Sequence, residues 1–158
     1  MAPMLVYQCL MRLTVQSDYA LRALVFLASN RERLSSIREI AGIYGISENY
    51  MVKIIHRLGG GGFIETIRGR NGGLRLARSP EEIRIGDVVR FTEEDFALVT
   101  CMQTERREGG GCLLMPDCSL RHTLGEALDA FLAVLDRKTL ADVVGEWEQR
   151  KLATAPAR

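Results

Sequence analysis

Apolar residues recur at helical spacing in three segments near the start of the chain, and a residue that can cap a helix precedes each segment. The spacing predicts a first helix from Ser17 to about Ser29, a second from the capping box Ser36-Ile37-Arg38-Glu39 to Gly45, and a third from Ser47 to about Leu58. A short second helix, a tight turn and an amphipathic third helix together form a helix-turn-helix pattern.

The third predicted helix divides its residues between two faces. Its apolar face consists of Met51, Ile54, Ile55 and Leu58. Its opposite face carries Asn49, Lys53 and His56, with Arg57 at the edge. We expect the apolar face to pack in the core and the polar face to meet water or a polar ligand.

A β-hairpin is predicted directly after this helix. The glycines at 59–62 should end the helix, and residues 63–68 have the β-branched and aromatic composition of a strand. Residues 69–73 place Asn-Gly at the centre of a turn, where positive φ is needed, and residues 74–77 form the returning strand. A hairpin that follows a helix-turn-helix is a wing.

The second half of the chain predicts two further helices separated by an irregular segment. A capping box at Ser79-Pro80-Glu81-Glu82 precedes a short helix around residues 86–91. Residues 92–118 lack periodicity and exceed the ~12–15 residues usual for a loop, so we expect them to be functional or disordered. Ser119 is predicted to cap a long helix to about Arg137, and Thr139 to begin a short terminal helix that frays from Lys151.

The long predicted helix has two apolar stripes side by side. The first consists of Leu120, Leu124, Ala127, Phe131 and Val134, and the second of Leu128, Leu132 and Leu135. Because one neighbour does not cover a face this wide, we expect it to pack on its own domain and on a partner subunit. The alternative is a helix fully buried in a monomer. The candidate dimer-interface residues are Leu120, Leu124, Leu128, Phe131, Leu132 and Leu135.

The predicted fold class is mainly α with a small β-hairpin, a winged helix-turn-helix with a long C-terminal dimerisation helix. We expect an extension outside the fold over residues 1–10, since Met11-Arg12-Leu13-Thr14 looks like a second start. A winged-helix DNA-binding domain would span 11–91, a cysteine-containing loop 92–118, and the dimerisation and terminal helices 119–150.

Charge is unevenly distributed along the chain, although the net formal charge is only +1. Residues 11–90 carry thirteen basic and eight acidic side chains, and residues 91–158 carry eight basic and twelve acidic ones, for net charges of +5 and −4. A basic N-terminal half can approach a phosphate backbone while the acidic half stays away from it.

The chain has no apolar run of about 18 residues and no signal peptide, so we expect a cytoplasmic protein without a membrane partner. Its four cysteines are then expected to be thiols or metal ligands rather than disulfides. We assign no role to Cys9.

Double-stranded DNA is the expected partner, because polar and basic residues converge on the third helix and on the wing. Cations suit phosphates, and hydrogen-bonding side chains suit base edges. The alternative is a set of ordinary solvated faces. The candidate DNA contacts are Ser35, Ser36, Arg38, Asn49, Tyr50, Lys53, His56, Arg57, Arg68, Arg70, Asn71 and Arg75.

Cys101, Cys112 and Cys118 all fall in the irregular segment, with the spacing C-x10-C-x5-C. Three thiolates in a glycine-containing loop suit a soft metal or an iron–sulfur cluster, which needs a fourth ligand from elsewhere. The residues alone leave three alternatives open: unrelated cysteines, a structural zinc site that includes His122, or a cysteine–histidine nucleophile pair. No orienting group or oxyanion site accompanies that pair, so we do not expect an enzyme.

Several runs together resemble the winged-helix iron–sulfur regulators that include NsrR, IscR and RirA. Two examples are Ser17-Asp18-Tyr19-Ala20-Leu21-Arg22-Ala23-Leu24 and Arg68-Gly69-Arg70-Asn71-Gly72-Gly73. Other matching runs lie at 11–14, 46–55, 74–76, 85–90, 92–99, 130–136 and 139–144, so the resemblance covers nearly all of 11–144. Residues 51–55 and 139–144 most resemble the nitric-oxide-sensing NsrR branch.

The resemblance implies a homodimeric repressor that releases its operator when nitric oxide damages a four-iron four-sulfur cluster, with a two-iron cluster as the alternative. The cluster would be held by Cys101, Cys112 and Cys118, and by an aspartate of the other subunit at the position of Asp18. Asp18 is equally explained as an anion favoured by a helix N-terminus.

The chain departs from the family pattern at two places. Arg121 stands where IscR-like members carry a histidine, three residues after the third cysteine, and His122 follows one residue later. The gap between Cys101 and Cys112 is longer than in NsrR, and residues 105–111 look like an insertion. An iron-responsive regulator of the RirA type, which also has a long first gap, is therefore the alternative function.

Overall fold

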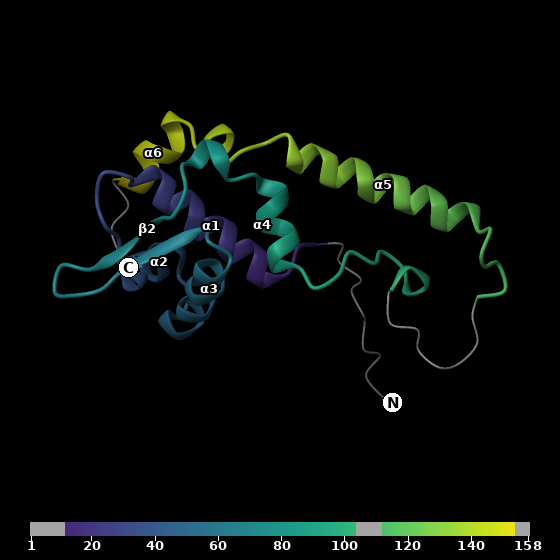
Figure 1. The fold of residues 1–158 in the computed structure, drawn as a ribbon, viewed down its shortest axis with the longest axis horizontal. Helices are drawn as coiled ribbons and strands as arrows, with labels where there is room; N and C mark the ends of the chain where they lie inside the picture. The colour runs from purple at the N-terminus through teal and green to yellow at the C-terminus, as the bar shows by residue number, and fades with distance from the viewer. Residues whose placement is uncertain (1–11, 104–111, 154–158) are drawn as a thin grey trace, which may run out of the picture.

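The computed structural model describes residues 12–103 and 112–153, so the expected extension at 1–10 and the expected insertion at 105–111 both lie outside the described residues. Figure 1 shows the described chain as a winged-helix body with one long helix projecting from it. The elements are α1 (Val15–Ser29), α2 (Ile37–Tyr44), α3 (Glu48–Gly60), β1 (Ile64–Ile67), β2 (Gly73–Leu76), α4 (Ile85–Thr92), α5 (Ser119–Asp136) and α6 (Glu146–Ala153). The predicted fold class, mainly α with a small hairpin, is confirmed.

Capping side chains set the ends of the first helices. Ser36 and Ser47 cap α2 and α3 as predicted, and Gly45, at φ 65°, ends α2 in the left-handed conformation. The predicted start of α1 is wrong: Thr14 caps it, by accepting a hydrogen bond from the Ser17 N–H at 3.3 Å. Ser17 is instead fully buried in the first turn.

The glycine run at 59–62 ends α3 two residues later than predicted. Gly59 and Gly60 continue the helix, because glycine is a poor helix former but still adopts helical angles. A Cβ on Gly61 would lie 2.8 Å from the rings of Phe63 and Phe91, so a larger residue there would have to displace these rings. Gly62, at φ 70°, then turns the chain toward β1.

The core lies between α1, α3, α4 and the inner face of the hairpin. The predicted apolar face of α3 is confirmed, since Met51, Ile54, Ile55 and Leu58 are all buried. They pack with buried residues of the other elements: Ala20, Ala23, Leu24, Phe26, Leu27, Leu74, Val88 and Val89. The hairpin is antiparallel, with Glu65 opposite Arg75.

The C-terminal part of the prediction needs two corrections. Cys118, not Ser119, occupies the N-cap position of α5. No α-helix begins at Thr139; its N–H and hydroxyl bond to the Asp142 carboxylate at 2.8 and 3.0 Å, a turn forms at Ala141–Val143, and α6 begins only at Glu146. Leu140 is fully buried in the winged-helix core, which ties this segment to the body.

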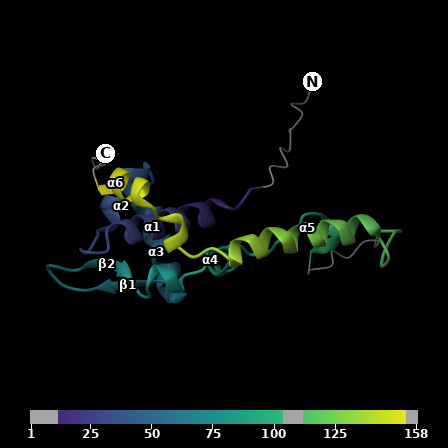
Figure 2. The same ribbon diagram turned by 90° about the horizontal axis from the view of Figure 1, so that it is seen from above.

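The long helix α5 has no buried residue, so the alternative of a helix fully buried in a monomer is wrong. Figures 1 and 2 both show the half of α5 that begins at Ser119 projecting away from the winged-helix body. Leu120, Phe131 and Val134 are 65%, 44% and 50% exposed. No helix within residues 12–103 and 112–153 is long and apolar enough to cross a membrane.

Candidate DNA interface and metal centre

The polar face of α3 is open to solvent. Asn49, Lys53 and His56 are exposed, whereas the opposite face of the helix is buried. Ser47 and the buried stripe together fix the helix in place, so these three side chains extend from a rigid element. The exposed face of α3 can therefore enter a major groove, which is wide enough to admit a helix.

The wing places a second polar group beside α3. Arg68, Arg70 and Asn71 lie exposed at its tip, where Gly69 has a φ of 115°. Arg75 lies further back on β2, and its guanidinium bonds the Glu65 carboxylate of β1 at 2.8 Å. That pair joins residues directly opposite in the hairpin, so Arg75 stabilises the wing in addition to carrying charge.

Several of the predicted DNA contacts have structural roles. Ser35 is 1% exposed and its backbone bridges to Leu74, so we leave its enclosed hydroxyl out of the interface. Ser36 caps α2, and Arg38 is exposed, 3.6 Å from Glu48. Tyr50 packs edge-on against the ring of Tyr19.

Arg57 joins the recognition helix α3 to two other helices. Its guanidinium donates to the Gln16 side chain on α1 and, at 3.0 Å, to the Phe91 carbonyl on α4. It also lies over the Phe91 ring, 5.8 Å from the ring centre. Arg57 therefore sets the position of α3 in the body, and this leaves little of it free for phosphate.

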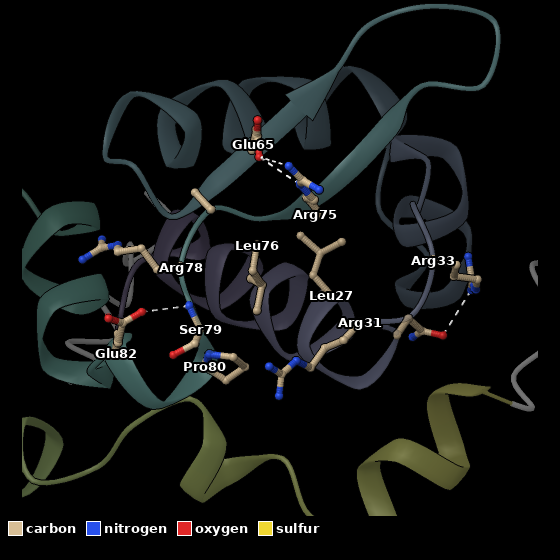
Figure 3. A pocket seen from close by; sticks show the side chains of 12 residues that line it. Leu27, Arg31, Arg33, Glu65, Arg75, Leu76, Arg78, Ser79, Pro80 and Glu82 are labelled. Carbon is tan, nitrogen blue, oxygen red and sulfur yellow. Dashed lines mark hydrogen bonds and ion pairs between the residues drawn. The ribbon is translucent and has the colours of Figure 1, made fainter.

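A surface pocket of 490 Å³ is lined by the end of α1, the hairpin and residues 77–82, and no residue of α3 lines it (Figure 3). Its floor includes Leu27 and Leu76. Figure 3 shows the arginines on different sides of its rim rather than converging on a common point, and Arg75 is turned toward Glu65. The pocket therefore lacks the convergent polar groups of a small-molecule site.

The three cysteines lie in the segment before α5, and the last of them occupies the N-cap at the projecting end of that helix. Cys101 is half-buried in the turn Thr100–Met102, Cys112 is exposed, and Cys118 is half-buried at the N-cap of α5. All three are free thiols on irregular backbone, a donor set that fits an iron–sulfur cluster. Within the described residues, however, no three His, Cys, Asp or Glu side chains lie close enough to hold a metal ion. That holds equally for the zinc alternative with His122.

Asp18 lies in the first turn of α1. The Arg22 Nε donates to its Oδ1 at 2.8 Å, and the two side chains are 47% and 45% exposed. Asp18 therefore keeps one carboxylate oxygen that bonds no group in the described part of the chain.

A hydrogen-bond network that the sequence did not predict holds the start of α1 against the end of α4. The Glu93 carboxylate accepts from the Thr14 N–H at 2.7 Å, the Thr14 hydroxyl at 3.1 Å and the Ser17 hydroxyl. The oxygen atoms of the Ser17 and Thr92 hydroxyls lie 2.6 Å apart. Since Ser17 precedes Asp18, this network fixes where Asp18 stands.

A salt bridge connects α4 to the C-terminal end of α5. The Arg90 guanidinium binds the Asp136 carboxylate twice, and a Cβ on Gly86 would lie 1.9 Å from that carboxylate. The hydrogen bonds from Arg90 hold the pKa of Asp136 below its usual value. The pair therefore persists at neutral pH and is lost only as the pH falls through that lowered pKa.

The comparisons with known proteins agree with this architecture. A family model described as "Rrf2: Iron-dependent Transcriptional regulator" matches residues 13–146. The chain belongs to the Rrf2 family of transcriptional regulators. Two similar relatives are the HTH-type transcriptional regulators NsrR of Bacillus subtilis (strain 168) and Geobacillus kaustophilus (strain HTA426), which are 52% and 53% identical over 135 residues, covering 85% of this chain and 90% of each relative. This Rrf2 regulator is thus of the NsrR type, as the sequence predicted.

A similar solved structure is that of T. potens IscR, with a TM-score of 0.67 and 27% identity over 89% of this chain and 91% of that one. The relatives of this Rrf2 regulator are transcriptional regulators rather than enzymes, which confirms the prediction that the chain is not an enzyme.

Glu93→Gln should destabilise this Rrf2 regulator by about 1 kcal/mol, because a neutral amide accepts hydrogen bonds more weakly than a carboxylate. The melting temperature of the cluster-free protein should fall by roughly 2–4 °C in thermal unfolding. Glu94→Gln is the control: Glu94 is exposed and forms no bond within the described residues, so its melting temperature should stay unchanged. Equal melting temperatures for the two variants would show that the network does not hold α1.

Proposed function

We propose that this chain is an iron–sulfur-containing repressor that binds operator DNA as a homodimer and releases it when nitric oxide damages the cluster. One observation carries the proposal in this NsrR-type chain: three free cysteines lie in the segment that leads into a long helix whose apolar face is uncovered. The recognition helix and wing supply the DNA contacts. The cysteines supply ligands, and α5 connects the two.

The homodimer follows from the exposed face of α5. Exposing this many apolar side chains to water is unfavourable, since burying each methylene group stabilises a protein by about 0.8 kcal/mol. Two copies of this helix present the same apolar face to each other, which is the self-complementarity that a two-fold interface requires. The proposed interface residues are Leu120, Leu124, Leu128, Phe131, Leu132 and Leu135.

The fourth cluster ligand is proposed to come across this interface. The Arg90–Asp136 salt bridge and the Glu93 network both engage the C-terminal end of α4, so we infer that Asp18 lies toward the C-terminal end of its own α5. Cys118 lies at the other end, and 18 helical residues span about 27 Å. Two α5 helices that pair antiparallel around a two-fold axis bring the outer end of one helix toward the body of the other. Cys101, Cys112 and Cys118 would then hold a cluster together with Asp18 of the partner subunit.

The chain's own contacts give a route from the cluster site to the DNA. When bound, the cluster supplies iron atoms with which nitric oxide reacts. Within each chain, Glu93 holds the first turn of α1, Asp136 holds α5 to α4, and Arg57 holds α3 to α1 and α4. A shift of α1 or α5 therefore reaches α3, and it alters the spacing of the two recognition helices, about 34–36 Å in a dimer that reads one turn of DNA.

The cluster itself is tested by purifying the protein without oxygen and measuring its visible spectrum with its iron, sulfide and zinc contents. We expect a coloured protein with close to four irons and four sulfides per chain. Two of each would indicate the two-iron form. A colourless zinc protein that still binds DNA would refute the proposed sensor.

Iron sensing is the second candidate function, and the long gap between Cys101 and Cys112 favours it. Operator binding is titrated with nitric oxide and, separately, with an iron chelator. Loss of binding with a few equivalents of nitric oxide supports the nitric-oxide repressor. Loss with chelator alone supports the iron-responsive one.

Mixing two variants tests whether Asp18 acts across the interface. Asp18→Ala homodimers should hold clusters without the aspartate, and Cys118→Ser homodimers should hold none. A mixed dimer should regain one cluster with the wild-type spectrum and lifetime, because one chain supplies the cysteines and the other supplies Asp18. If the mixed dimer shows only the Asp18→Ala spectrum, Asp18 is no ligand from the partner and returns to helix capping.

A further inference from the structure

The recognition helix α3 has one exposed aliphatic side chain among its polar ones. Val52 is 48% exposed, while the other apolar residues of the helix outside its glycine end are buried or half-buried. A single exposed valine is ordinary on a protein surface. The position of Val52, however, is the feature that calls for an explanation.

Val52 lies on the face of α3 that is proposed to read DNA. It follows Asn49 by three residues and precedes His56 by four, so the three side chains form one strip along the helix. All three are exposed, and Lys53 lies beside them. A ligand that packs against Asn49 and His56 therefore also covers Val52.

Packing in the described core does not explain why a valine stands at position 52. Val52 is not among the residues of the described core or the half-buried side chains packed against that core. Valine is also a poorer helix former than alanine at an exposed position, because its branched side chain is restricted in a helix. The fold alone would therefore favour another residue here.

We propose that Val52 determines sequence specificity by packing against the 5-methyl group of a thymine in the major groove. The thymine methyl is the one apolar group that a base pair presents there, and aliphatic side chains recognise it by contact. Neighbouring Asn49 can donate to and accept from an adjacent base edge, so the strip combines polar and apolar recognition. This inference rests on the DNA-binding part of the proposed function.

The probe is the duplex that the cluster-loaded protein, purified without oxygen, enriches from a random-sequence library. Each thymine of this duplex is replaced in turn by deoxyuridine. This replacement removes only the methyl group. At one thymine per half-site, affinity should fall about four-fold, the usual effect of burying one methylene-sized group. With both half-sites replaced, the loss should be about fifteen-fold.

Val52→Ala should remove this discrimination, so that the variant binds the thymine and deoxyuridine duplexes equally. Val15→Ala is the matched control, since Val15 is 47% exposed at the start of α1, and it should keep the full ratio. Equal melting temperatures for both variants and the wild type will show that the fold is intact.

The outcomes separate this inference from the proposed function. If no duplex is enriched, the proposed function fails. If a duplex is enriched but no single deoxyuridine weakens binding, or if Val52→Ala keeps the wild-type ratio, the thymine contact is refuted while DNA binding stands.

Discussion

Cys118→Ser should abolish cluster binding while leaving the helix on which it lies intact. A serine hydroxyl is a hard, protonated donor, and iron–sulfur clusters are held by soft thiolates. Serine is at the same time a better N-cap than cysteine, and position 118 is the N-cap of α5. The variant should therefore contain no cluster iron and show no visible absorption.

The melting temperature of cluster-free Cys118→Ser should equal or slightly exceed that of the cluster-free wild type. Cys9→Ser serves as the control, because Cys9 has no assigned role, and it should keep the wild-type spectrum and iron content. Wild-type iron content in Cys118→Ser would remove this cysteine from the ligand set.

Lys53→Ala should weaken operator binding on the order of tenfold per half-site, and a hundredfold for the dimer, because it removes a cation facing the phosphates. Each lost phosphate contact lowers the slope of log affinity against log salt by about 0.9, so the dimer should lose about two units of slope. Fluorescence anisotropy at several salt concentrations measures both quantities.

Lys151→Ala is the matched control for this charge change. Lys151 is exposed on α6, and Figure 1 shows α6 on the other side of the body from α3. Its affinity and salt slope should match the wild type. A Lys53→Ala protein with a wild-type slope would place the DNA on another face.

Local patterns in the sequence were sufficient to predict the winged helix. The stripe from Met51 to Leu58 and the serine caps at 36 and 47 each depend on neighbours within four residues, and all of them are in the structure. The hairpin also forms, but its positive φ falls at Gly69 rather than at Asn71 or Gly72, so the predicted Asn-Gly turn conformation is wrong. The error at the first helix lies where a distant residue competes with the local signal. Ser17 has the sequence of a cap, yet Thr92 and Glu93, some 75 residues away, hold it in the core.

The candidate sites show the same limit. Spacing along α3 predicts which side chains share a face, and burial confirms that Asn49, Lys53 and His56 are free. Spacing does not show that Arg57 holds α1 and α4 or that Arg75 pairs with Glu65, because the groups that bond these arginines come from other elements. Spacing along the chain says least about the geometry of the cluster ligands, since the proposed set of ligands is completed only in a dimer.

One titration tests the proposed nitric-oxide response most directly. Cluster-loaded wild-type protein is mixed with labelled operator duplex without oxygen, and nitric oxide is added stepwise while visible absorption and fluorescence anisotropy are recorded on the same sample. We predict that cluster absorption and DNA binding disappear together within a few equivalents of nitric oxide, and that Cys118→Ser shows neither change. Operator binding that persists after the cluster absorption has gone would contradict it.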